Sequence, residues 1–177
     1  MDYDKPQSEF AENVIAIDRV ARVVAGGRRF RFRALVVVGN SKGRLGVGIA
    51  KGSDVQLAIA KAVNEAKKNL IDISLTNGTI AHEITAKVSG ASILLKPAAP
   101  GTGLIAGGTV RSVLEVSGVN NILSKSLGSS NKVNVAYATI KALQGVVPRE
   151  EWVTKHVKAT SDTKKSNAQP KKAKVTA

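Results

Sequence analysis

Nine arginine and lysine residues occur within residues 19–51, and no Asp or Glu interrupts them. Surface charge usually mixes both signs, whereas a surface that binds phosphate groups excludes carboxylates. Guanidinium and ammonium groups neutralise phosphates, and glycines let a partner's backbone come close. The chemistry that this stretch could do is binding of a polyanion, and the predicted RNA-binding residues are Arg19, Arg22, Gly26, Gly27, Arg28, Arg29, Arg31, Arg33, Lys42, Arg44 and Lys51.

The residue pattern around these cations predicts strands. Residues 14–24 are rich in Val and Ile and end at two glycines, as a strand does when it runs into a loop. Residues 29–38 follow the period-two pattern of a half-buried strand, in which successive side chains point to opposite faces. This pattern places Arg29, Arg31 and Arg33 on one strand face. Phe30 and Phe32 could form a stacking platform for bases. Because they share the phase of the apolar residues that follow, we expect both rings in the core.

A glycine-containing turn at residues 39–43 leads into a third predicted strand, whose Gly46, Gly48 and Ala50 share one face. Small residues on a strand let a helix or a nucleic-acid backbone approach closely. Ser53 and Gln56 fit a capping box, so a helix should begin there. The first unit is predicted as a three-stranded antiparallel sheet with one helix across it, followed by a linker near residues 70–74.

The second half of the chain predicts strands and helices in a different order. Asn77 and Gly78 form a strong hairpin signal, and strands are expected over residues 80–88, 92–96 and 121–127. A short helix should end at Gly118, and a last helix should begin near Asn131 and end at Gly145. The fold class is therefore α+β in two small domains, βββα and ββαβα, with predicted segments 1–12 (flexible), 13–72, 73–147 and a basic, disordered tail over 148–177.

Other motifs give no support for catalysis. Gly101, Gly103 and Ala106 match a relaxed dinucleotide fingerprint, but two prolines precede it and no acidic residue follows at the required distance. We expect these glycines to let a partner come close, with Arg111 reaching outward. His82 has no second ligand nearby, and no Cys is present. The sequence predicts a protein that is not an enzyme and has no cofactor and no metal site.

Composition agrees with a polyanionic partner. The chain has 27 Lys and Arg against 13 Asp and Glu, a formal charge of +14, which fits nucleic acid or an acidic membrane surface. The first ten residues lack the basic start and apolar core of a signal peptide, and no apolar run is long enough to span a membrane. We expect a cytoplasmic protein, with Trp152 docking the start of the tail.

Several long motifs, in the same order, resemble those of the family of the fifth protein of the bacterial small ribosomal subunit. The similarity covers residues 13–147. It lies in Gly26-Gly27-Arg28-Arg29-Phe30, in the run from Ala34 through Asn40 to Gly48, in Asn77-Gly78-Thr79 with His82, and in residues 101–108 with Arg111, Val113, Leu114 and Glu115.

The resemblance implies a first domain similar to double-stranded RNA-binding domains and a second of ribosomal type. It implies small-subunit ribosomal RNA and the fourth and eighth small-subunit proteins as partners, near the messenger RNA entry and decoding region. Residues 21–28 then match a loop that affects spectinomycin sensitivity, including Ala21, Ala25, Gly26 and Gly27. Gly103 and Arg111 match an interface with the fourth protein, where changes loosen decoding accuracy.

Two alternatives remain open from the sequence. A free-standing regulator that binds double-stranded RNA would have the same basic stretch, but would not sediment with the small subunit in high salt. A nucleotide-dependent enzyme would show a nucleotide-dependent thermal shift. A ribosomal scaffold protein, which neutralises RNA phosphates and packs on protein neighbours, is the leading hypothesis.

Overall fold

The computed structural model describes residues 10–148 and Trp152. Within them the elements follow in the order β1 (Ala11–Val24), β2 (Gly27–Gly39), β3 (Arg44–Gly52), α1 (Val55–Lys68), β4 (Leu70–Asp72), β5 (Ile84–Val88), β6 (Ala91–Pro97), β7 (Leu104–Ile105), α2 (Gly108–Ser117), β8 (Ile122–Gly128) and α3 (Lys132–Gln144). The α+β class predicted from the sequence is confirmed.

The first sheet has four strands in the order β1-β2-β3-β4, all antiparallel. The prediction of three strands and a linker at residues 70–74 is wrong, because β4 pairs with the start of β3 and Ile71 packs against the core. The strand β1 begins at Ala11, opposite Gly39, so Ala11 and Glu12 belong to the sheet and not to a flexible segment. Residues 1–9 lie outside the described part of the chain.

The helix α1 covers the face of the first sheet on which β3 carries its small residues, as the sequence predicts. A Cβ atom on Gly46, Gly48 or Gly52 would collide with main-chain atoms of α1 or of the turn before it. The predicted capping box is wrong. Asp54 is the N-cap, its carbonyl accepts from the Ala58 N–H at 3.0 Å, and no side chain caps the helix. Ser53 cannot serve, because β3 continues to Gly52 and the chain bends over residues 53–54.

The second sheet has the order β5-β6-β8-β7. The strand β7 was not predicted from the sequence, because it has only two residues, which pair parallel with β8. Asn77 and Gly78 both have positive φ, as the predicted turn requires, but they close only an isolated bridge between Thr76 and Thr79. Residues 80–83 are therefore not strand, and His82 lies in a bend.

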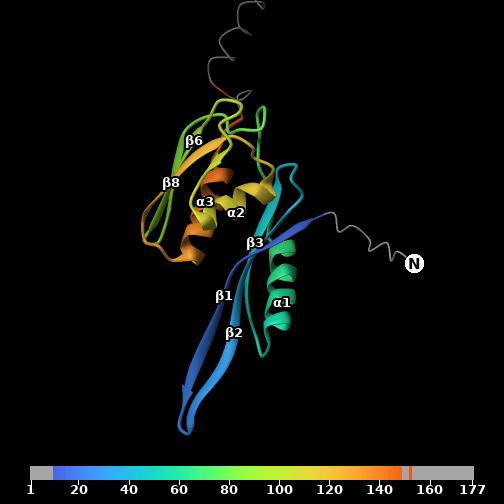
Figure 1. The fold of residues 1–177 in the computed structure, drawn as a ribbon, viewed down its shortest axis with the longest axis vertical. Coiled ribbons are helices and arrows are strands. Elements are labelled where there is room, and N and C mark those ends of the chain that lie inside the picture. Colours follow the sequence, from blue (N-terminus) through green and yellow to red (C-terminus); the bar gives the residue numbers. More distant parts are fainter. Residues whose placement is uncertain (1–9, 149–151, 153–177) are drawn as a thin grey trace, which may run out of the picture.

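The elements stack in four layers, namely α1, the first sheet, α2 with α3, and the second sheet (Figure 1). The first sheet is buried on both faces in its upper half: Ala34, Val36 and Val38 face α1, while Leu35 and Val37 join the core of the second unit. One apolar core thus connects the two sheets. The division of the chain at residues 72 and 73 stays a prediction.

The turn between β2 and β3 joins the two units through the carboxyl end of α2. The Ser41 N–H donates to the Val116 carbonyl and the Gly43 N–H to the Ser117 carbonyl, both at 3.1 Å. The last carbonyls of a helix have no partner within it, so the turn supplies the missing donors. Gly118 ends α2 with a φ of 87°, as predicted, and packs directly on Ser41.

Candidate nucleic-acid interface

The strands β1 and β2 form a long hairpin that extends beyond α1 and the second unit (Figure 1). Their register sets Arg22 opposite Arg29 and Val20 opposite Arg31, and residues directly opposite in an antiparallel pair share a face. Lys51 of β3 lies opposite Arg33 and extends the same face. The alternation in the sequence therefore predicts correctly that Arg29, Arg31 and Arg33 share one face of the strand.

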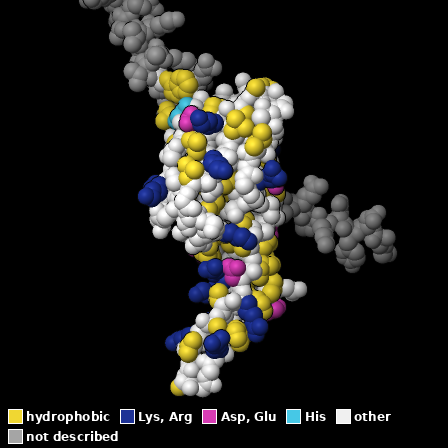
Figure 2. Space-filling view, turned by 60° about the vertical axis from the view of Figure 1, so that its left-hand side comes forward, with side chains coloured by type: hydrophobic (Ala, Val, Ile, Leu, Met, Phe, Trp, Pro, Cys, Tyr) yellow, Lys and Arg dark blue, Asp and Glu magenta, His cyan; other side chains and the backbone are white. Residues whose placement is uncertain are grey.

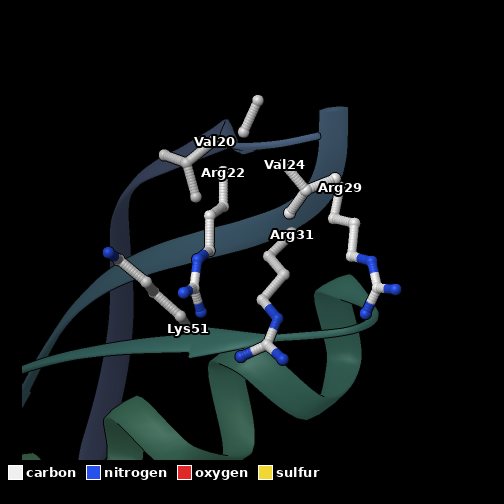
Figure 3. Close-up of a pocket in the computed structure, with 7 residues that line it drawn as sticks. Val20, Arg22, Val24, Arg29, Arg31 and Lys51 are labelled. Carbon is white, nitrogen blue, oxygen red and sulfur yellow. The ribbon is translucent and has the colours of Figure 1, made fainter. Parts of the chain in front are cut away.

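These side chains surround a depression of about 450 Å³, which we call the basic groove. Its lining residues are Val20, Ala21, Arg22, Val24, Arg29, Arg31 and Lys51. The cationic side chains come from three strands and border the same hollow (Figure 3). The groove has apolar walls between its cations and no carboxylate in its lining, which suits a ligand that carries phosphates.

The four cations of the basic groove, Arg22, Arg29, Arg31 and Lys51, are exposed and form no ion pair with any residue that the structure describes. In the space-filling view Lys and Arg side chains gather over the narrow hairpin end of the molecule, where carboxylates are sparse (Figure 2). Because no carboxylate compensates them, these four groups keep their full charge available to a partner.

Two predicted RNA-binding residues are instead held by carboxylates. Arg33 donates to Asp18 at 2.7 Å, and Arg44 donates to Asp72 at 2.8 Å. The hydrogen bond from Arg44 lowers the pKa of Asp72, so this pair weakens only as the pH falls below the ordinary range of aspartate. Neither partner was predicted from the sequence, because Asp18 lies one residue before the acid-free stretch and Asp72 lies beyond it.

The remaining predicted cations do not share the basic groove. Arg19 and Arg28 lie on the opposite face of the hairpin, as their register shows. Lys42 is exposed in the turn at the junction with α2. Arg19 and Arg28 lie apart from the groove because alternate residues of a strand point to opposite faces.

Ala25 and Gly26 form the turn at the hairpin end, and Gly27 begins β2 with a φ of 135°. A Cβ atom on Gly26 or Gly27 would meet nothing within 4 Å. No intramolecular contact requires the small size of Gly26, which leaves its main chain accessible to a partner. Ala21, Ala25, Gly26 and Gly27, the predicted antibiotic-sensitivity residues, are all exposed at this end.

The two phenylalanines of β2 have different surroundings, although the sequence predicts both as core. Phe32 is partly buried and packs on the cluster beneath α1. Phe30 lies beyond the reach of that cluster and is 49% exposed. The Cζ atom of Arg19 lies 3.9 Å from the centroid of the Phe30 ring. The core prediction is wrong for Phe30 because the hairpin continues past the helix that would cover it.

The glycine-rich loop over residues 101–108 is held by one asparagine. The N–H groups of Gly101 and Gly103 both donate to the Asn121 Oδ1 at 3.0 Å. Two main-chain donors that a phosphate would need are thus already used, which agrees with the rejection of a nucleotide site. Arg111 is exposed on α2 and donates to the Leu104 carbonyl at 3.4 Å. No sequence signal pointed to Asn121.

Among the described residues no cluster of three His, Cys, Asp or Glu could hold a metal ion. Glu83 forms an ion pair with Lys96, and the His82 ring meets Trp152 edge-on, with centroids 6.3 Å apart. Trp152 thus docks on the second unit, as predicted, while the rest of the tail after residue 148 lies outside the described residues. No described helix is both long and apolar enough to span a bilayer.

Comparison with known proteins gives consistent matches along the chain. Residues 10–74 match the family model "Ribosomal protein S5, N-terminal domain", and residues 86–156 match "Ribosomal protein S5, C-terminal domain". The chain is 53% identical over 139 residues to "Small ribosomal subunit protein uS5" of Thermus thermophilus. These 139 residues cover 78% of this chain and 86% of the relative. The proteins of that name from two strains of the same species match equally well.

Proposed function

Since the chain belongs to the ribosomal protein S5 family, we propose that its basic groove binds ribosomal RNA within the small subunit. Family membership makes it a structural ribosomal protein and not an enzyme. The observation that carries the proposal is the basic groove itself, with four exposed cations from three strands and no carboxylate in its lining. The RNA-binding residues that we propose within the groove are Arg22, Arg29, Arg31 and Lys51.

The mechanism is electrostatic and geometric. Each cation that contacts a phosphate releases a condensed counterion, so binding weakens as salt rises. Arginine and main-chain contacts of this kind follow the shape and the backbone of RNA and do not read base sequence. The cations lie on strands of a sheet, which hold them at fixed positions. A binding site on such elements is more precise than one on loops.

Replacing Arg22, Arg29 and Arg31 together with Gln should weaken binding to small-subunit ribosomal RNA and flatten its salt dependence. The slope of log K against log salt should fall by about 0.7 to 0.9 for each phosphate that is no longer neutralised. Titrations of the full chain at several salt concentrations measure the slope. Arg44→Gln is the matched control, because Arg44 is already paired with Asp72 and lies outside the groove. An unchanged slope in the triple variant would exclude the groove as the phosphate site.

Asp18→Asn should strengthen RNA binding, because it removes a carboxylate that lies on the same hairpin face as the groove and releases Arg33. We expect higher affinity at low salt and a slope steeper by about 0.7 to 0.9, the value for one more neutralised phosphate. Both partners are partly exposed, so the loss of stability should stay below about 1 kcal/mol. Asp72→Asn, which releases Arg44 away from the groove, should leave both quantities unchanged. Weaker binding of Asp18→Asn would mean that the ion pair itself shapes the site.

The finer place within the subunit is a proposal from the resemblance. We propose that the second unit, through Gly103 and Arg111, contacts the fourth small-subunit protein, that the eighth is a further neighbour, and that the hairpin end lies near the decoding region and the messenger RNA path. A role in spectinomycin sensitivity for Ala21, Ala25, Gly26 and Gly27 is part of the same proposal, as is a cytoplasmic location. The exposure of the hairpin end and of Arg111 supports it.

Arg111→Leu should raise misreading without unfolding the protein, because its side chain is exposed and makes only one long hydrogen bond. Reporters of stop-codon readthrough and missense incorporation measure the effect in cells that depend on the variant. Glu115→Gln, one turn further along the same helix and also exposed, is the matched control. Normal error rates for Arg111→Leu, with the variant present in ribosomes, would remove Arg111 from the proposed interface.

A further inference from the structure

The face of the hairpin opposite the basic groove has a different character. It carries exposed apolar side chains, of which Ile17 is 44%, Val23 77% and Phe30 49% exposed. Two arginines, Arg19 and Arg28, lie among them on the same face. We call these five residues the second hairpin face. Exposed apolar groups gathered on one surface mark an interaction site more often than scattered ones do.

Within this face Arg19 and Phe30 form a preorganised pair. The Arg19 Cζ lies 3.9 Å from the centroid of the Phe30 ring, which is a stacking contact, and both side chains remain exposed. The aromatic ring restrains a side chain that would otherwise be free to move, because the ring face attracts a cation. The ring therefore restrains Arg19, which remains exposed and can contact a further flat group.

The charge of the second hairpin face indicates what that group is. Along the hairpin from Ile17 to Phe32 this face carries Arg19 and Arg28 and no carboxylate, because the register places Asp18 on the other face. A neutral or basic peptide would leave both charges uncompensated. A nucleotide offers a flat apolar ring system together with a phosphate, which matches a guanidinium stacked on an aromatic ring.

We propose that Arg19 and Phe30 form a stacking site for an unpaired nucleobase, with Arg28 beside it available for the adjoining phosphate. This inference rests on the proposed function, because the base would belong to the same ribosomal RNA that occupies the basic groove. The hairpin is two strands wide, so RNA on one face and RNA on the other would enclose it. The groove then supplies the salt-dependent part of binding, and the stacking site supplies a part that depends little on salt.

The test compares Phe30→Leu with wild-type protein, both as full chains, in binding to small-subunit ribosomal RNA. Leucine keeps an apolar side chain but lacks the flat ring, so affinity should fall by about fivefold or more, with the salt slope unchanged. Chemical probing of the RNA bases should show loss of protection at an unpaired base. Phe30→Trp keeps a ring and should retain affinity and protection. Leu127→Ser, which changes an exposed apolar residue of β8 away from the hairpin, should have little effect.

The outcomes separate this inference from the proposed function. If Phe30→Leu leaves affinity and base protection unchanged while the triple arginine variant flattens the salt slope, the stacking site is wrong and the groove assignment stands. If neither Phe30→Leu nor the triple arginine variant changes RNA binding, the stacking site and the groove assignment are both wrong. If Phe30→Leu instead releases a neighbouring protein from the subunit with base protection intact, the second hairpin face binds protein and the inference is overturned. Thermal unfolding of each variant verifies that the fold is retained.

Discussion

Gly48→Ala should destabilise the protein more than any other single methyl group added to the first sheet. A Cβ atom at this position would overlap the Ala62 carbonyl oxygen and lie 2.6 Å from the Ala66 nitrogen. Both are main-chain atoms of α1, so no side chain can rotate away and the helix itself must move. We expect a loss of about 3 kcal/mol, the upper end for overpacking, and a melting temperature lower by about 6–12 °C.

Gly108→Ala is the matched control for this change. Gly108 begins α2, and a Cβ there would meet nothing within 4 Å, so this variant should be as stable as wild type or slightly more so. Urea unfolding monitored by circular dichroism measures both variants. A Gly48→Ala protein with wild-type stability would show that α1 is not seated on the small-residue face as described.

Gly118→Ala should weaken the junction between the two units. Gly118 has a φ of 87°, a conformation that costs about 1–2 kcal/mol with a side chain. An added Cβ would also overlap the Ser41 carbonyl oxygen in the turn between β2 and β3. We expect a total loss of about 3 kcal/mol. Hydrogen exchange should speed up at the Ser41 and Gly43 amides, because they donate to the end of α2.

Gly101→Ala separates the two parts of this effect. Gly101 has a similar φ of 93°, but a Cβ there would meet nothing within 4 Å. Its substitution therefore reports the backbone strain alone, and the difference between the two variants reports the collision with Ser41. Equal losses in unfolding free energy would mean that the turn yields to a side chain at residue 118. Unchanged exchange at Ser41 and Gly43 would contradict the role of the turn as a helix cap.

The junction also supports the hairpin of β1 and β2. The upper half of β2 is buried on both faces, and the turn that follows β2 is fixed to α2. The hairpin therefore projects from a base that belongs to both units. A cation on such a support keeps its position relative to the second unit, so the proposed RNA ligand of the groove and the proposed neighbours of the second unit would be held in a fixed relation.

Local patterns in the sequence determined much of the framework. Period-two alternation placed Arg29, Arg31 and Arg33 on one strand face. The glycines of β3 predicted a close approach by a helix or a nucleic-acid backbone, and α1 is the close neighbour. Asn131 caps α3 through the Val133 N–H, and Gly118 ends α2, as their residue types suggest. Such features depend on the conformational preferences of a few neighbouring residues. They can therefore be predicted without knowledge of distant contacts.

Only the tertiary structure shows which cations of residues 19–51 are paired with carboxylates. Arg33 meets Asp18, 15 residues away, and Arg44 meets Asp72, 28 residues away, because strand register brings them together. The face of β2 that carries Leu35 and Val37 is buried together with residues of α2. The helix α2 follows β2 by about seventy residues, roughly half the described chain. A count of charges in residues 19–51 therefore predicted a polyanionic partner. It could not show that seven of the nine cations divide between a basic groove, two ion pairs and an arginine held on an aromatic ring, with Arg28 and Lys42 outside these groups. Pairing and packing are set by contacts between distant segments.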